Sequence, residues 1–236
     1  MLKHLKERYG IKEFQIYDDN FTMYRNNLKK LLTMIIDERL DMTWSCNARV
    51  DMIDEELLGL MERAGCWQIS IGIETGNEKI MESLNKNITI GKVVKAVEWC
   101  RNAGIRTVGY FMIGHFGETE KTIEETVNFA IDIGLDDFRM SFFTPLPGTA
   151  ANQIAHLHGE FDYDWEKMTV FSPVFVPSGL TRDYLIEAQK KALRKFFFRP
   201  RIIASYMKMV KNPIIAFQGA CAFGSYVFNS RKNRSI

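Results

Sequence analysis

Three charged residues at or just beyond the ends of predicted strands, and a fourth in the segment that follows one of these strands, could together bind a small molecule. They are Asp19, Arg49, Glu74 and Lys86. The carboxylate of Glu74 can accept hydrogen bonds from hydroxyl or ammonium groups. The planar guanidinium of Arg49 suits a carboxylate, and Lys86 can supply a point charge to the same group. Such a set predicts a ligand that needs cationic, anionic and hydrogen-bonding partners around one cavity.

Each of these residues also has an ordinary structural interpretation, and the sequence leaves both open. Glu74 could form an ion pair with a neighbouring cation such as Arg49. Lys86 could be a solvated surface charge, and Asp19 could simply cap the helix that follows it. His115, in a later loop, could transfer protons or only make local hydrogen bonds.

The cysteines and the remaining histidines form no recognisable metal site. Four cysteines are spread along the chain without paired spacing: Cys46, Cys66, Cys100 and Cys221. This spacing argues against a disulfide framework and against a compact metal knuckle. His156 and His158 have no nearby cysteine cluster and fall short of a ligand set. Unpaired cysteines and a charged start without a secretory signal favour a cytoplasmic location.

The elements that position these residues alternate between strand-like and helix-like patterns, which is typical of repeated β-α units on a parallel sheet. Five apolar-rich strands are predicted, at residues 14–18, 42–48, 67–74, 105–113 and 136–144. Three of the intervening helices are followed by Gly65, Gly104 and Gly134, where a left-handed residue can close the last turn.

Two of the predicted strands alternate clearly enough to assign their faces. In one of them Ile69, Ile71 and Ile73 share a face, opposite Gln68, Ser70, Gly72 and Glu74. In the other, Thr43, Ser45, Asn47 and Arg49 oppose Met42, Trp44, Cys46 and Ala48. The apolar faces should meet helices, and the polar faces should line an enclosed lumen. A polar lumen indicates a ligand site, although small polar residues and water could also fill such a barrel.

The last third of the chain has a different character. Residues 151–180 are irregular and aromatic, which predicts a long loop or lid, and helices return at Thr181, a plausible N-cap. Pro200 and Pro213 should divide the tail into short helices. Residues 190–236 hold eleven Lys and Arg and no acidic residue, so the preceding 189 residues carry a net charge of −9.

This basic tail could dock on the acidic body, contact anionic lipid or bind nucleic acid. Interspersed apolar residues without a dense basic run disfavour nucleic acid. We therefore expect docking within the chain first and peripheral membrane contact second. No uncharged run reaches the ~20 residues that a spanning helix needs.

Six short motifs, five of them where predicted strands end, together suggest a family. They are residues 17–22 (YDDNFT), 46–51 (CNARVD), 72–76 (GIETG), 113–119 (IGHFGET), 144–149 (TPLPGT) and 198–200 (FRP). In this order they resemble the barrel and C-terminal extension of radical S-adenosylmethionine proteins that carry an N-terminal cobalamin-binding domain. The resemblance covers nearly the whole chain. Phe116 stands where that family usually has Pro, which could loosen the turn.

The resemblance implies a fold and a division of the chain. The fold is α/β, a partial parallel (β/α)6-type barrel that lacks its first unit, followed by a helical C-terminal extension. Residues 1–150 would form the barrel part, residues 151–180 the loop or lid, and residues 181–236 the extension. The absent unit would carry the strand before the cluster loop. Without it, the first strand present would be an open apolar edge that favours aggregation.

The resemblance also implies cofactors and a reaction on a small-molecule substrate. S-adenosylmethionine would bind through Glu74, Arg49, Asp19 and Lys86. Its reductive cleavage would give a 5′-deoxyadenosyl radical that takes hydrogen from an unactivated carbon, before methyl transfer or ring closure. A [4Fe-4S] cluster and cobalamin are implied for the parent enzyme. The cluster's C-x3-C-x2-C triplet is absent from this sequence.

We therefore expect a radical enzyme fragment that is inactive alone. The missing cluster and cobalamin region would precede Met1 or belong to a partner chain. The first alternative is a noncatalytic degenerate barrel or partner subunit. The second is a phosphate-binding β/α barrel enzyme, because Gly114 and Gly117 could belong to a glycine-rich phosphate loop.

Overall fold

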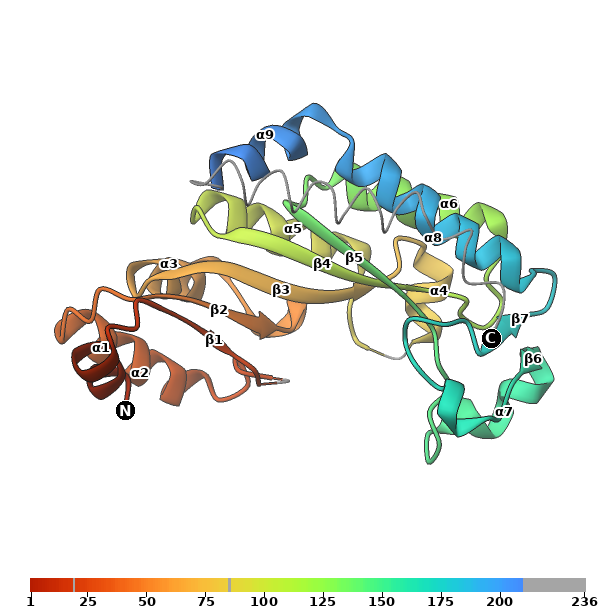
Figure 1. The fold of residues 1–236 in the computed structure, drawn as a ribbon, viewed down its shortest axis with the longest axis horizontal. Coiled ribbons are helices and arrows are strands. Elements are labelled where there is room, and N and C mark those ends of the chain that lie inside the picture. The colour runs from red at the N-terminus through yellow and green to blue at the C-terminus, as the bar shows by residue number, and fades with distance from the viewer. Residues whose placement is uncertain (19, 85, 210–236) are drawn as a thin grey trace.

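A single parallel sheet organises the first two thirds of the protein (Figure 1). The computed structural model describes residues 1–18, 20–84 and 86–209 of the 236-residue chain. Five strands lie side by side in chain order: β1 (Glu13–Ile16), β2 (Thr43–Ala48), β3 (Cys66–Glu74), β4 (Arg106–Ile113) and β5 (Asp137–Phe142). All five predicted strands are confirmed, with ends shifted by no more than two residues.

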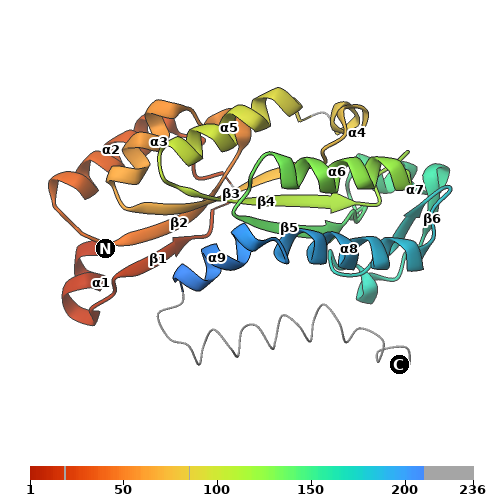
Figure 2. The same cartoon turned by 90° about the horizontal axis from the view of Figure 1, so that it is seen from above.

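Helices follow the strands and cover one face of the sheet, and α8 and α9 lie beside β5 (Figure 2). Their bounds are α1 (Leu2–Tyr9), α2 (Arg25–Asp37), η1 (Val50–Met52), α3 (Glu55–Arg63), α4 (Glu78–Ser83), α5 (Ile90–Asn102), α6 (Glu120–Asp132), α8 (Arg182–Phe197) and α9 (Pro200–Met209). Within the described ranges, none of these helices has the length and apolar character needed to cross a lipid bilayer. The α/β class and the helical C-terminal part are as predicted.

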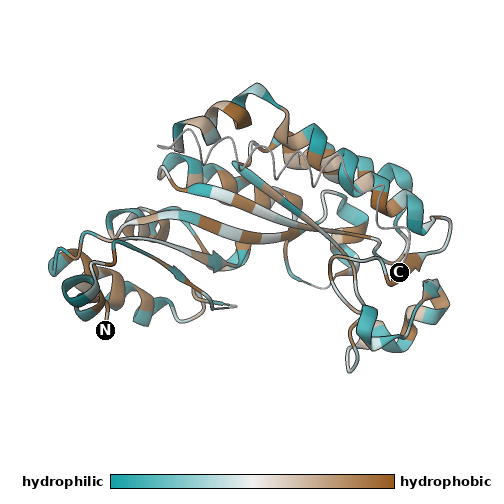
Figure 3. Ribbon diagram, in the orientation of Figure 1, coloured by the Kyte–Doolittle hydropathy of each residue, from teal (hydrophilic) through white to brown (hydrophobic). Residues whose placement is uncertain are grey.

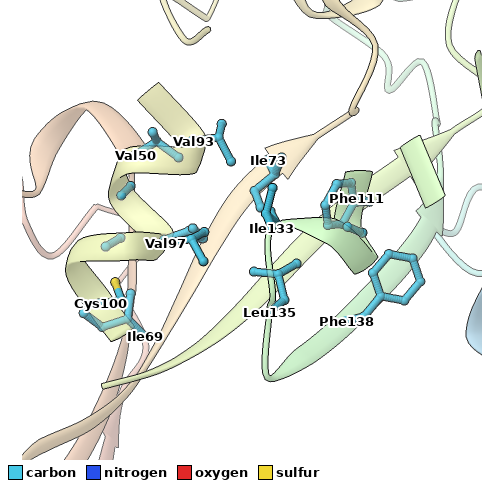
Figure 4. Close-up of a cluster of buried hydrophobic side chains, with 14 of the residues drawn as sticks. Val50, Ile69, Ile73, Val93, Val97, Cys100, Phe111, Ile133, Leu135 and Phe138 are labelled. Carbon is cyan, nitrogen blue, oxygen red and sulfur yellow. The ribbon is translucent and has the colours of Figure 1, made fainter. Parts of the chain in front are cut away.

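The core lies between the sheet and its helices. Ile69, Ile71 and Ile73 of β3 are fully buried. Figure 4 shows Val97 and Cys100 of α5 beside this strand, and apolar positions alternate along the strands in Figure 3. The predicted apolar face of β3 therefore packs against helices. Burial of isoleucine and valine side chains on this scale is the main stabilising contribution to such a layer.

Glycine closes three of the helices that lead into strands. Gly65, Gly104 and Gly134 all have positive φ angles, as their positions predict. The need for a residue without a side chain is strictest at position 65, where a Cβ atom would lie 2.1 Å from the carbonyl oxygen of Met42. Any other residue at position 65 would push β2 away from the start of β3.

The segment predicted as an irregular aromatic loop contains regular structure. It forms α7 (Ala150–His158), β6 (Gly159–Phe161), η2 (Trp165–Lys167) and β7 (Phe175–Pro177), with β6 and β7 paired antiparallel. We call residues 150–177 the cap unit. The Thr149 hydroxyl accepts a hydrogen bond from the Asn152 backbone N–H and so begins α7. Figure 1 shows the cap unit beyond the C-terminal ends of β4 and β5.

The C-terminal extension docks through backbone carbonyl groups. Thr181 caps α8 as predicted, by accepting from the Tyr184 N–H, and α9 begins at Pro200. Arg199 and Arg201 of the extension donate to backbone carbonyls around the end of α6: Arg199 to Ile131, and Arg201 to Gly134 and Leu135. Arg101 of α5 donates to the carbonyl of Ile133 beside them. Cations are favourable at a helix C-terminus. The expected docking of the basic tail is thus seen for residues up to 209, whereas the break expected at Pro213 lies outside the described residues.

Candidate functional site

Glu74 is the most constrained of the predicted site residues. It ends β3 with a φ angle of 72°, a left-handed conformation that glutamate seldom adopts. Its side chain is 10% exposed and forms an ion pair with Lys86, which lies between α4 and α5. Strained backbone of this kind is often found at functional sites. The ion pair brings Glu74 and Lys86 together at the C-terminal end of the sheet.

Gly72 provides the space for this carboxylate. A Cβ atom at position 72 would lie 2.9 Å from Glu74 Oε1. The carboxylate is therefore folded back over Gly72, on the strand face opposite Ile71 and Ile73. The polar face that the alternation predicts for β3 thus carries an acidic group beside a position without a side chain.

Arg49 follows β2 on the neighbouring strand, and Ala48 pairs with Ile71 in the ladder. Its guanidinium donates from Nε and Nη2 to the two carboxylate oxygens of Asp51, each at 2.9 Å. The hydrogen bond from Arg49 lowers the pKa of Asp51. Glu74 thus forms an ion pair, as its structural interpretation predicts, but the partner is Lys86, whereas Arg49 pairs with Asp51.

Asp19 lies outside the described residues, but its neighbours show that the loop after β1 is polar inside. The Thr22 side chain is buried, and neither Thr22 Oγ1 nor Asn20 Oδ1 has a hydrogen-bond partner among the described residues. An unpaired buried polar group costs about 1–3 kcal/mol, so such atoms indicate places where a further partner binds.

The loop after β4 holds two further groups of this kind. The Glu118 carboxylate accepts from the backbone N–H groups of Gly114 and His115, while its Oε1 has no hydrogen-bond partner among the described residues. His115 is 1% exposed, and both ring nitrogens also lack such a partner. Burial raises the pKa of Glu118 to about 7. Burial, and then the charge of Lys86, lowers the pKa of His115 to about 4.

His115 lies near enough to the Glu74–Lys86 pair for the charge of Lys86 to act on its imidazole. Phe111 of β4 is the ladder partner of Glu74, which places the loop after β4 beside the end of β3. The sequence suggested local hydrogen bonds for His115, and the structure shows none to its ring among the described residues. A neutral imidazole has one donor and one acceptor to offer a ligand.

Phe116 connects this loop to the cap unit. Its ring stacks on His158 with the centroids 4.6 Å apart, and meets Phe175 and Phe143 edge-on at 5.1 and 5.2 Å. Aromatic pairs in these geometries contribute about 0.5–1.5 kcal/mol each beyond area burial. Phe116, in place of the family's usual Pro, was expected to loosen this turn. In the structure its ring instead packs the turn against the cap unit. His158 is part of this packing, and no metal-binding group is found among the described side chains.

Sequence comparison identifies the family. The profile of the Radical SAM superfamily matches residues 1–130. The chain belongs to this superfamily. An uncharacterised methyltransferase of Pyrococcus horikoshii is 30% identical over 203 residues, which cover 86% of this chain and 44% of the relative. The anaerobic magnesium-protoporphyrin IX monomethyl ester cyclase of Rubrivivax gelatinosus is 29% identical, over 82% of this chain and 35% of the cyclase.

Solved structures agree on the fold. The radical S-adenosylmethionine methyltransferase TsrM of Kitasatospora setae, with cobalamin and a [4Fe-4S] cluster bound, has a TM-score of 0.60 and 20% identity. The similarity covers 85% of this radical SAM chain and 40% of TsrM. The chain thus spans less than half the length of each of these three proteins.

The residues of this radical SAM chain do not fit an iron-sulfur cluster. Its sequence has no C-x3-C-x2-C triplet, and Cys46, Cys66 and Cys100 are buried in the helix-covered core. A hydrogen bond with Cys46 and burial raise the pKa of Cys66, and burial raises the pKa of Cys100 to about 11. Cluster ligation needs thiolates, which these environments disfavour.

The acidic, basic and unpaired polar groups do fit S-adenosylmethionine, which presents an ammonium, a carboxylate, a ribose and an adenine. Sequence reasoning did not single out Asp51, Glu118 or the packing role of Phe116. Asp51 carried a usable signal, because opposite charges two residues apart after a strand can pair. Glu118 and Phe116 become recognisable only from their burial and contacts.

Proposed function

We propose that this chain is the S-adenosylmethionine-binding part of a radical enzyme whose cluster and cobalamin are held by another region or chain. The observation that supports this most is the Glu74–Lys86 ion pair at the C-terminal end of the sheet. Ligands of parallel α/β folds bind at this end of the strands. Glu74 would accept hydrogen bonds from the ammonium or ribose, and Lys86 would move to the carboxylate.

Arg49 has a supporting part in this proposal. Its guanidinium is 41% exposed and already paired with Asp51, so a ligand carboxylate would have to share it. Lys86, on a long flexible stem and 38% exposed, can turn toward a ligand more easily. We propose Asp19, in the loop after β1, as a further partner of the ammonium group.

The parent reaction is part of the proposal. In the parent enzyme a reduced cluster held elsewhere would supply one electron, which would cleave S-adenosylmethionine into methionine and a 5′-deoxyadenosyl radical. The radical would take a hydrogen atom from an unactivated carbon of a small-molecule substrate. Methyl transfer and ring closure are both represented among the names of similar proteins. The role of this chain would be to bind and orient the cofactor, and alone it would be inactive.

The experiment is calorimetric titration of the 236-residue chain with S-adenosylhomocysteine. Glu74→Gln and Lys86→Met should each weaken binding by about 1–3 kcal/mol, because each removes a charged hydrogen-bond partner. The matched controls are Glu82→Gln and Lys79→Met, which remove the same charges from exposed positions on α4. Equal affinity for Glu74→Gln and Glu82→Gln would remove Glu74 from the site.

A noncatalytic degenerate barrel or partner subunit is the second candidate, and the absent cysteine triplet favours it. The sequence of the DNA before the Met1 codon separates the two. An in-frame cysteine triplet would support a fragment of a longer enzyme. A nearby in-frame stop would leave a degenerate barrel or a subunit whose partner chain holds the cluster, and binding of S-adenosylhomocysteine would favour the subunit. The superfamily match leaves the phosphate-binding barrel enzyme without support.

A further inference from the structure

The imidazole of His115 is the buried polar group that the proposed function leaves unused. It is 1% exposed, with no hydrogen-bond partner for either nitrogen among the described residues. One face meets Phe143, at a centroid distance of 4.9 Å. Each unpaired nitrogen costs free energy in a dry environment, so the position favours a bound partner with both a donor and an acceptor.

The partner should be uncharged at this point. The lowered pKa of His115 means that its ring is neutral at physiological pH, and the nearby ammonium of Lys86 opposes protonation further. A charged ligand group would have to lose its hydration in these apolar surroundings, whereas a hydroxyl or a ring nitrogen can pair with a neutral imidazole at a lower cost. The charged end of the same ligand would lie at Glu74 and Lys86, because Glu74 pairs in the ladder with Phe111, four residues before His115, and the charge of Lys86 acts on the imidazole.

The loop that carries His115 contacts the cap unit through the next residue. Phe116 is held between His158 of α7 and Phe175 of β7. Gly114 lies near α8, since a Cβ atom there would be in ordinary van der Waals contact with Leu185, at 3.5 Å.

We propose that His115 is a ligand-binding residue whose imidazole hydrogen-bonds an uncharged polar group of the molecule held at Glu74 and Lys86. Phe116 is the positioning residue that closes the cap unit over this contact. The ligand contact rests on the proposed function, whereas the closure by Phe116 does not depend on it.

Modification by diethylpyrocarbonate, mapped by mass spectrometry, measures the closure. The four histidines of the chain serve as probes in one sample. In Phe116→Ala the modification rate of His115 should rise about tenfold or more, as expected when local packing of about 1.4 kcal/mol is lost. His4, on the distant helix α1, should react at an unchanged rate. Phe116→Tyr keeps the ring and should restore protection.

Phe171→Ala is the matched control, because this cap-unit ring is 79% exposed. It should leave the His115 rate at the wild-type value. A protected His115 in a Phe116→Ala protein with native circular dichroism would overturn the positioning role. If Phe116→Ala fails to fold, Phe116→Leu, which keeps apolar volume without the ring, replaces it and is judged by the same change in the His115 rate.

The ligand contact is measured with S-adenosylhomocysteine. His115→Phe, which keeps the shape and removes both nitrogens, should weaken its binding about tenfold, the effect of one lost hydrogen bond. Saturating S-adenosylhomocysteine should also slow the modification of His115 in Phe116→Ala. Binding that Glu74→Gln weakens but His115→Phe leaves unchanged would overturn the ligand contact and leave the proposed function standing. Absence of any binding would count against both.

Discussion

Arg199 Nη1 donates a hydrogen bond of 3.1 Å to the backbone carbonyl of Ile131, which ties the C-terminal end of α8 to the end of α6. The same guanidinium lies 4.1 Å from the ring centroid of Phe196. Arg199→Met should therefore lower the free energy of unfolding by about 1–3 kcal/mol, measured by urea denaturation.

Arg182→Met is the matched control for this prediction, because Arg182 is exposed in the first turn of α8. Its effect should stay within about 0.5 kcal/mol, as for most surface substitutions. Equal effects of the two variants would mean that the carbonyl cap of Arg199 contributes nothing measurable.

His115 and Glu118 should impose opposite pH dependences on stability. The pKa of Glu118 is raised to about 7, so the folded chain binds a proton there more tightly than the unfolded chain does. The contribution of Glu118 to the free energy of unfolding therefore falls as pH rises from about 4.5 to 7. The pKa of His115 is lowered to about 4, so the unfolded chain takes up the proton first. This second contribution is lost as pH falls from about 6.5 to 4.

Urea denaturation across this pH range checks both signs. The free energy of unfolding of Glu118→Gln, relative to that of the wild type, should rise by about 3 kcal/mol as pH rises from about 4.5 to 7. That of His115→Gln should rise by a similar amount as pH falls from about 6.5 to 4. A variant curve parallel to the wild type would show that the corresponding group titrates equally in both states.

Gly72→Ala should weaken ligand binding without lowering the stability of the fold. The new Cβ would meet the end of the Glu74 side chain, which can rotate away, and Gly72 does not have a positive φ angle. We expect S-adenosylhomocysteine affinity to fall about fivefold or more, with little change in melting temperature. Gly91→Ala, with open space around its Cβ position in α5, should leave affinity unchanged. Unaltered binding in Gly72→Ala would show that the carboxylate does not need its present position.

The buried thiols should be inert. Cys66 and Cys100 have raised pKa values, so in the native chain neither should react appreciably with maleimide within an hour at neutral pH, a test read by peptide mass spectrometry. Anaerobic reconstitution with iron and sulfide should give no stoichiometric [4Fe-4S] spectrum. A well-formed spectrum that disappears in Cys46→Ala would contradict this assignment of the cysteines to the core.

Structural features could be predicted from the sequence where local backbone geometry favours a particular residue type. Positive-φ glycines after helices, the alternation of Ile69, Ile71 and Ile73, and the cap at Thr181 could all be predicted, because each follows from local backbone geometry. The position of Glu74 at the end of its strand followed from the same alternation.

Partnerships between distant residues could not be predicted. Lys86 pairs with Glu74 across a helix and two loops, and no periodicity encodes that contact. Phe116 contacts His158 and Phe175 because the cap unit folds back onto the loop after β4. The helix α7 was missed because it was grouped with the proline- and aromatic-rich stretch that follows it. The unpaired nitrogens of His115 are a property of the surrounding packing, which a loop sequence does not reveal.

The left-handed backbone of Glu74 bears on how this chain changes over evolutionary time. A glutamate in that conformation costs about 1 kcal/mol that glycine would not. In a lineage that no longer uses the site, drift toward stability would favour glycine or asparagine at position 74. Retention of glutamate there among close homologues would therefore be a record of continued selection for the carboxylate, and would distinguish a working barrel from a degenerate one.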